Sequence, residues 1–234
     1  MKSDKAALGL WTAEYESRGL PSSFLTEPSG AVRDFVAMAL GLGIKPLDCL
    51  AIDVGCGTGR NSLYLAQHGF TVYAIDQVPR LVNELQIKAQ ALGLTPRLQA
   101  ICGDVCEPWP LGDASAGVAV DTFCYKHIMD AKDRAAYRRE LARVVKSGGL
   151  FLLTLASIED GYYGSLPYRS VSSGMRAIRD PANGIESVLY ERTTVEEQFA
   201  CNFSVVRHVE KKKPGEMHGG EYARAGHFFV MQRR

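Results

Sequence analysis

The chain has 234 residues, of which 46% are hydrophobic and 23% are charged, with 27 Lys and Arg against 26 Asp and Glu. This length suffices for one α/β domain with a sizeable core, and the composition is that of an ordinary globular protein. A formal net charge of +1 creates no general field that attracts nucleic acid, so a nucleic-acid partner is disfavoured. The run Lys211–Lys213 is interpreted as a solvated edge or turn.

Targeting and cysteine patterns also exclude several classes of protein. No apolar stretch approaches the length of a membrane span, and the first apolar run is too short for a signal peptide. The six cysteines are scattered without a C-x-x-C pair, which favours free thiols over a disulfide framework or a zinc site. We therefore expect a cytoplasmic protein with no membrane partner and no metal; the oligomeric state is unknown from sequence.

Residues 1–45 are predicted to be a helical segment packed on the core, and beyond them short apolar runs alternate with amphipathic stretches. The expected strands are 50–54, 71–76, 97–102, 117–123 and 150–156. The expected helices are 60–68, 78–92 and 131–145, the last ended by Gly148 and Gly149. Such alternation predicts an α/β fold with a doubly wound, mostly parallel sheet and helices on both faces. Ligands of such sheets bind outside the carboxyl ends of the strands.

The pattern changes after Ser157. Residues 157–185 are rich in Gly, Ser, Tyr and Pro and are predicted to form a long irregular insertion that acts as a substrate lid. Thr193 and Glu196 have the spacing of a capping box at the start of another helix. Two late strands then complete a seven-stranded sheet with an antiparallel C-terminal strand. The whole chain is expected to be one domain, comprising an N-terminal lid (1–45), a core (46–157), the insertion (157–185) and a C-terminal helix and strand pair (186–234).

A glycine-rich stretch, "DVGCGTGR", follows the first predicted strand at residues 53–60. Gly55 and Gly57 match the first two glycines of the dinucleotide fingerprint G-x-G-x-x-G, but the third position is Arg60. A bulky side chain there counts against NAD or FAD, and no Gly-Lys-Ser/Thr follows to make a P-loop. What remains is an acidic residue, Asp53, before three alternating glycines.

With this pattern the sequence resembles the class I S-adenosylmethionine-dependent methyltransferases, over roughly residues 45–157. The stretch 53–60 is similar to the first motif of that family. Later motifs follow in the family's order, namely Asp76 after the second strand, "GDV" at 103–105, "VDTF" at 120–123 and a Gly-Gly turn before the fifth strand. The resemblance implies S-adenosylmethionine as the cofactor and S-adenosylhomocysteine as the product.

The resemblance also implies roles for individual residues. Asp53 would order the methionine amino end, and the glycine loop would face the methionine carboxylate and the ribose. Asp76 would accept hydrogen bonds from the ribose hydroxyls, with Gln77 beside the adenine, while Asp104 and Val105 would bond the adenine edge. The full set of predicted cofactor-binding residues is Asp53, Gly55, Cys56, Gly57, Thr58, Gly59, Asp76, Gln77, Asp104, Val105, Asp121 and Phe123.

Methyl transfer from a sulfonium is an in-line displacement, so its main demand is alignment, and a base is needed only for an acceptor proton of high pKa. The candidate catalytic residues are His127 and Tyr125, just past the fourth strand; alternatively, His127 orders the loop. Aromatic walls could come from Phe123, Trp11 and Tyr15, with core packing as the alternative. His218 is a further pocket candidate, with a flexible turn as the alternative.

Neutral charge and the lack of an appended binding module favour a small-molecule acceptor. Planar or anionic molecules could be held by the insertion's Tyr162, Tyr163, Tyr168 and Arg169; alternatively, "DGYYG" is only a turn with exposed tyrosines. A second hypothesis is a tRNA or protein methyltransferase, which requires a basic strip gathered from Arg176, Arg179, Lys211–Lys213 and Arg224. A third is a non-catalytic, cofactor-binding regulatory protein, against which the intact glycines argue.

Overall fold

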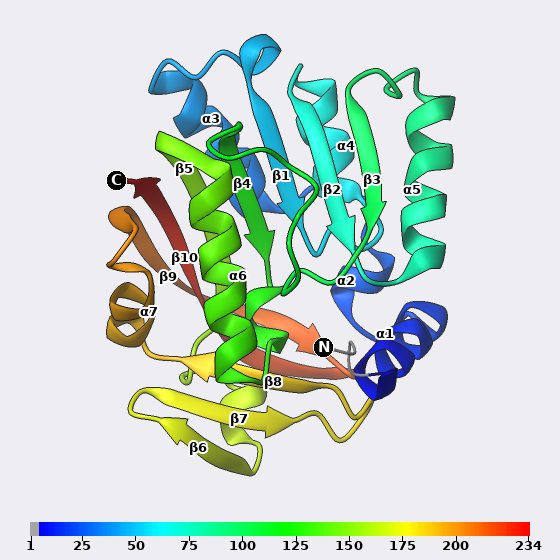
Figure 1. The fold of residues 1–234 in the computed structure, drawn as a ribbon. Helices are drawn as coiled ribbons and strands as arrows, with labels where there is room; N and C mark the ends of the chain where they lie inside the picture. The colour runs from blue at the N-terminus through cyan, green and yellow to red at the C-terminus, as the bar shows by residue number, and fades with distance from the viewer. Residues whose placement is uncertain (1–4) are drawn as a thin grey trace.

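A seven-stranded sheet forms the centre of the protein, of which the computed structural model describes residues 5–234 (Figure 1). Its strand order is β3-β2-β1-β4-β5-β10-β9, with β10 antiparallel to both of its neighbours. The strands are β1 (Leu50–Val54), β2 (Thr71–Asp76), β3 (Leu98–Cys102), β4 (Ala116–Thr122), β5 (Val145–Ala156), β9 (Phe203–Met217) and β10 (Gly220–Arg233). The predicted doubly wound, mostly parallel sheet with an antiparallel C-terminal strand is confirmed.

Helices cover both faces of this sheet. One face packs against α3 (Gly30–Gly41), α4 (Arg60–Gln67) and α5 (Pro79–Ala91), and the other against α6 (Ala131–Val144) and α7 (Arg192–Phe199). The central strands β1 and β4 are buried along nearly their whole length, as their continuous apolar runs require. Helix α6 begins where Asp130 caps it, because this side chain accepts from the backbone N–H groups of Lys132 and Asp133.

Two N-terminal helices, α1 (Lys5–Ser17) and α2 (Pro21–Phe24), lie beyond the carboxyl ends of the parallel strands (Figure 1). The carboxylate of Glu14, only 2% exposed, holds them in place. It accepts hydrogen bonds from the Leu20 N–H, from Ser23 Oγ at 3.1 Å and from Asn183 Nδ2 at 3.0 Å. The N-terminal helices are therefore attached to the segment just before β8 (Glu186–Tyr190).

The segment predicted to be irregular contains strands, which corrects that prediction. β6 (Tyr168–Ser172), β7 (Met175–Arg179) and β8 (Glu186–Tyr190) form a separate three-stranded antiparallel sheet. The strands are short, and β6 has almost no buried side chain, so it lacks the alternation that identifies a half-buried strand. Gly174, with φ +69°, makes the tight turn between β6 and β7.

Two predicted element boundaries are also wrong. Helix α6 ends at Val144 and β5 begins at Val145, so Gly148 and Gly149 lie inside the strand instead of ending the helix. Helix α7 begins at Arg192 with no side-chain cap, so there is no capping box. The Glu196 carboxylate instead pairs with Arg192 at 2.7 Å, one turn earlier on the same helix.

Among residues 5–234, no helix combines the length and the apolar character that crossing a membrane would require.

Gly59 sets how closely α5 packs on the first loop. It is the N-cap of α4 with φ +80°, and a Cβ there would overlap the side chain of the fully buried Leu85. We expect Gly59→Ala to lower the free energy of unfolding by about 3 kcal/mol, from backbone strain and overpacking together. Denaturant unfolding measures this value.

Gly93→Ala is the matched control, because Gly93 has φ +69° but a Cβ added there would meet nothing within 4 Å. This variant should lose only the backbone contribution, about 1 kcal/mol. Equal losses in the two variants would show that the contact with Leu85 costs nothing.

Candidate functional site

A cavity of about 700 Å³ lies at the carboxyl ends of β1 to β4. The strand order reverses between β1 and β4, which is where open α/β sheets bind ligands. One side of the cavity is lined by the loops after β1, β2 and β3, and the other by the segment after β4, by α1 and by the hairpin of β9 and β10. The cavity size lies within the usual range of small-molecule sites.

Three glycines after β1 allow other parts of the chain to approach the backbone closely. A Cβ on Gly55 would lie 2.6 Å from Cys124 Sγ of the segment after β4. A Cβ on Gly57 would overlap the hydroxyl of Tyr15, which comes from α1. Together with the contact between Gly59 and Leu85, these approaches join the loop to three separate elements.

Asp76, at the end of β2, ties that loop to the second strand. Its Oδ2 accepts from the Gly57 N–H at 2.8 Å and its Oδ1 from the Val78 N–H at 2.9 Å. The carboxylate lines the cavity, and burial raises its pKa. Each carboxylate oxygen retains a lone pair, so Asp76 can still accept hydrogen bonds from a ligand.

Asp53 lies beneath the loop and is completely buried. Its Oδ2 accepts from Ser62 Oγ at 2.5 Å, whereas Oδ1 has no donor among the described residues. Burial raises the pKa of this carboxyl to about 6. A buried acceptor without a donor is costly, so Asp53 favours a ligand or water that supplies one.

Asp104 and Val105 follow β3 and line the same side of the cavity as Gln77. Asp104 Oδ1 accepts from the Cys106 N–H at 2.9 Å, which closes a tight turn. The Val105 carbonyl accepts from Trp109 Nε1 at 3.0 Å, which fixes the turn to the core.

Asp121 organises the segment after β4 instead of lining the cavity, which corrects the prediction that it contacts the cofactor. It is completely buried, and its carboxylate accepts from the N–H groups of Cys124 and Tyr125 and from the Tyr137 hydroxyl at 2.7 Å. Burial raises the pKa of this carboxyl to about 7. Asp121 thus fixes the turn that presents Phe123 to the cavity, where Phe123 adopts a φ of +71°.

Tyr125 also points away from the cavity, and this placement corrects its predicted catalytic role. The side chain is fully buried beneath α6 and α7, and its hydroxyl contacts Gln198 at 2.7 Å and Arg138. The ring stacks on Tyr190 with centroids 6.0 Å apart. Tyr125 is therefore a core residue that anchors the turn from below.

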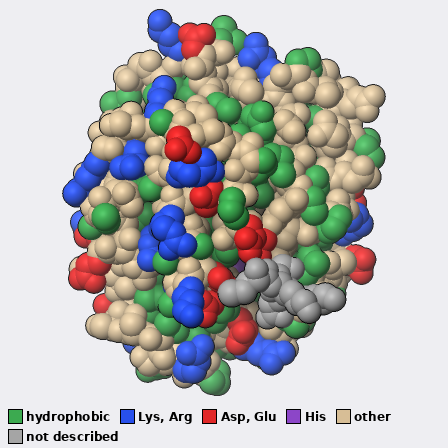
Figure 2. All heavy atoms as spheres, viewed as in Figure 1, with side chains coloured by type: hydrophobic (Ala, Val, Ile, Leu, Met, Phe, Trp, Pro, Cys, Tyr) green, Lys and Arg blue, Asp and Glu red, His purple; other side chains and the backbone are tan. Residues whose placement is uncertain are grey.

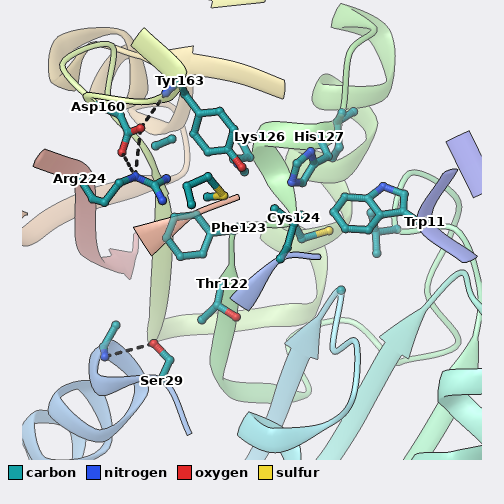
Figure 3. A pocket seen from close by; sticks show the side chains of 18 of the residues that line it. Trp11, Ser29, Thr122, Phe123, Cys124, Lys126, His127, Asp160, Tyr163 and Arg224 are labelled. Atoms are coloured by element: carbon teal, nitrogen blue, oxygen red, sulfur yellow. Dashed lines mark hydrogen bonds and ion pairs between the residues drawn. The ribbon is translucent and has the colours of Figure 1, made fainter. Parts of the chain in front are cut away.

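His127 does line the cavity, where its ring meets that of Trp11 edge-on at 4.7 Å (Figure 3). Its Nδ1 lies 2.9 Å from the Glu186 carbonyl oxygen. Because a carbonyl only accepts, Nδ1 carries the proton and Nε2 keeps the free lone pair. Burial and the neighbouring Lys126 lower the pKa of His127 well below its usual value, so the ring is neutral at neutral pH.

The predicted site residues thus separate into two groups. Those that line the cavity are Gly55, Asp76, Gln77, Asp104, Val105, Phe123 and His127, together with the predicted aromatic residues Trp11 and Tyr15. Those outside the lining are Asp53, Cys56, Gly57, Thr58, Gly59, Asp121 and Tyr125. His218 also lies outside, where Nε2 contacts Asp180 Oδ2 at 2.9 Å, as do Tyr162, Tyr168 and Arg169.

Sequence reasoning missed Lys126 and Asp160, which lie beside Tyr163 and Arg224 in the cavity (Figure 3). Lys126 is only 4% exposed although lysine is rarely buried, and no pattern in the neighbouring sequence predicts its burial. Asp160 sits in a turn and accepts from the backbone N–H groups of Tyr163 and Ala225 and from Arg224 Nε. Only the folded chain brings these residues to the segment after β4.

Some of the cations proposed for a basic strip are paired with acids. Lys211 lies 3.2 Å from Asp34, and Arg224 lies 2.9 Å from Asp160. Figure 2 shows Lys and Arg side chains interspersed with Asp and Glu on the viewed face. This face therefore presents mixed charge to a partner.

The sequence of residues 52–153 matches the model of a family described as a methyltransferase domain. A similar protein is an uncharacterized methyltransferase of Emericella nidulans, 30% identical over 140 residues that make up 53% of this chain and 48% of the relative. Another is the 2-methyl-6-phytyl-1,4-hydroquinone methyltransferase of Synechocystis sp., 36% identical over 51% of this chain and 37% of the relative. The chain thus spans about half or less of the length of these curated relatives.

A solved structure has the same fold over the whole chain. It is the 1,6-didemethyltoxoflavin-N1-methyltransferase of Burkholderia thailandensis, with bound 1,6-didemethyltoxoflavin and S-adenosylhomocysteine. The TM-score is 0.68 at 19% identity, and the match covers 100% of this chain and 91% of the other.

The bond between Tyr137 and Asp121 is open to a direct test. We expect Tyr137→Phe to lower the free energy of unfolding by about 2 kcal/mol, because a buried carboxylate loses a hydrogen-bond donor. Tyr190→Phe is the matched control, since Tyr190 is equally buried but its hydroxyl has no partner among the described residues. The control should lose no stability; a loss in Tyr190→Phe as large as in Tyr137→Phe would contradict the role given to Asp121.

Proposed function

We propose that this chain, whose residues 52–153 match the model of a methyltransferase domain, is a class I S-adenosylmethionine-dependent methyltransferase that transfers a methyl group from S-adenosylmethionine to a small-molecule acceptor. The observation that carries the proposal is a single cavity in which the loops after β1, β2 and β3 face the segment after β4. Such continuity would allow cofactor and acceptor to meet without crossing solvent.

The residues on the cofactor side fit S-adenosylmethionine. Asp76 would accept from the two ribose hydroxyls, while Asp104 and Val105 would bond the edge of the adenine beside Gln77. Beneath the loop, the unpartnered Oδ1 of the buried Asp53 would accept from a water that bridges to the cofactor's amino group. Gly55 lines the cavity and Tyr15 lies against Gly57, so the glycine loop would meet the cofactor together with this ring.

S-adenosylmethionine, when bound, supplies an already activated methyl group on a sulfonium. The chain's own task is therefore mainly to orient the acceptor and to exclude water. Phe123, Trp11 and Tyr15 would contribute aromatic walls, which tolerate a nearby cation better than an aliphatic wall does. His127, neutral and with its Nε2 lone pair free, would take a proton from an acceptor that carries one.

Several observations support a small molecule over a macromolecule as the acceptor. The cavity is of small-molecule size, and two of the cations beside it, Lys211 and Arg224, are paired with acids. The relatives whose printed names identify an acceptor act on small molecules. We place the reaction in the cytoplasm, in keeping with the six free cysteines.

Cofactor binding is tested most directly at Asp76. Calorimetric titration should show that S-adenosylhomocysteine binds, and that Asp76→Ala weakens binding by about 100-fold through the loss of charge-assisted hydrogen bonds. Asp48→Ala, which removes an exposed carboxylate outside the cavity, should leave binding unchanged. The proposal would be refuted if NAD bound tightly and S-adenosylhomocysteine did not bind. It would also be refuted if, in a screen of metabolites and tRNA, only tRNA were methylated.

The role of His127 is tested by His127→Gln. We expect kcat for an acceptor found in that screen to fall by about 100-fold, with the affinity for S-adenosylhomocysteine unchanged. His68→Gln is the control, because His68 Nδ1 also contacts a carbonyl, that of Tyr64 at 2.8 Å, but lies outside the cavity.

The pH profile provides a second measure. A base whose pKa is lowered stays neutral and active down to that lower pKa, so kcat should not fall between pH 8 and about 6.5. An unchanged kcat in His127→Gln would mean that alignment alone carries the reaction.

A further inference from the structure

Lys126 is the least expected residue of the cavity. It follows β4 in a short 3-10 turn (Tyr125–His127), lines the cavity and is 4% exposed. Its Nζ lies 4.3 Å from the centre of the Tyr163 ring and 5.7 Å from that of Phe123, and no described residue accepts a hydrogen bond from it. An ammonium group has three donors, so this one is buried with its hydrogen-bonding capacity unused.

Arg224 brings a second cation to the same aromatic ring. Arg224 lies on β10, and its guanidinium carbon is 5.2 Å from the centre of the Tyr163 ring (Figure 3). Its Nε donates to both oxygens of Asp160, at 3.2 and 2.9 Å, whereas its terminal nitrogens have no acceptor among the described residues. Two cations with unused donors thus each contact the ring of Tyr163.

The nearby acids are already engaged elsewhere. Asp160 accepts from two N–H groups of its own turn and from the Ala225 N–H, in addition to Arg224. Asp180 accepts from the Tyr162 hydroxyl at 2.8 Å and contacts His218. Neither carboxylate accepts a hydrogen bond from Lys126, and the other titratable neighbour, His127, is neutral.

Burial and the field of Arg224 together lower the pKa of Lys126 to about 7, partly offset by Asp160 and Asp180. An ammonium in this position gains most from an anion that supplies the missing acceptor, because the pair offsets the desolvation of the charge. The rings of Tyr163 and Phe123, both near Nζ, offer flat apolar surfaces on which a planar group would stack.

We infer that Lys126 and Arg224 form the acceptor subsite and hold an anionic oxygen, a carboxylate or a phenolate, on a planar molecule beside Tyr163 and Phe123. This inference rests on the proposed function and specifies its substrate class. It makes Lys126 a specificity-determining residue, distinct from His127 and from the residues that would hold the cofactor.

The test compares matched anionic and neutral probes by thermal unfolding and calorimetry, with and without S-adenosylhomocysteine. One arm pairs benzoate and naphthoate with benzamide and naphthamide; the other pairs para-nitrophenolate with para-nitroaniline. In at least one arm the anion should bind about tenfold more tightly than its neutral partner, the value of one charge-assisted hydrogen bond. The arm that responds identifies the carboxylate or the phenolate.

Lys126→Met should abolish the preference for the anion, and Lys126→Arg should restore it in part. Lys132→Met is the control, because it removes an exposed lysine of α6 outside the cavity and should leave the preference intact. Lys126→Met removes a buried charge without a partner, so it should fold with undiminished thermal stability. Equal binding of anion and neutral partner in both arms, or a preference that survives in Lys126→Met, would overturn the inference. Failure of the proposed function gives a different result, because S-adenosylhomocysteine would then not bind, whether or not the anionic probes bind.

Discussion

The structure depends on the absence of side chains at three positions after β1. Cys124, Tyr15 and Leu85 occupy the space that Cβ atoms on Gly55, Gly57 and Gly59 would need. These contacts bring the segment after β4, the N-terminal helix α1 and the helix α5 against a single loop. Because the same loop bonds to β2 through Asp76, the proposed cofactor side and the proposed acceptor side of the cavity share one wall.

Three buried carboxylates hold the elements around the cavity to one another. Glu14 holds α1 and α2 to the chain just before β8, and Asp121 holds the turn after β4 to α6. Asp160 holds the turn after β5 to β10. Each is almost completely buried and bonded to several donors, which is the condition under which an ionised carboxyl is tolerated in a core. Of these three acids only Asp160 lines the cavity, and its oxygens are already engaged by donors of the chain.

Charge in the cavity is distributed unevenly as a result. The side toward β2 and β3 presents the carboxylates of Asp76 and Asp104, which suit hydroxyl and amino donors. The side toward β10 presents Lys126 and Arg224 with the nearby acids already occupied. This division separates the proposed acceptor subsite from the proposed cofactor site by the charge of their side chains.

Local sequence determined the parallel core and its glycine loop, because apolar periodicity and glycine spacing are properties of neighbouring residues. The same is true of Asp76 and Asp104, whose positions follow from the ends of β2 and β3. Tertiary structure alone decided that Asp121 and Tyr125 face the core and that Lys126 is buried over Tyr163, since residues so far apart in the chain meet there only after folding. It also decided that residues 157–185 contain strands, because an exposed strand such as β6 shows no alternation and is specified by its pairing partner.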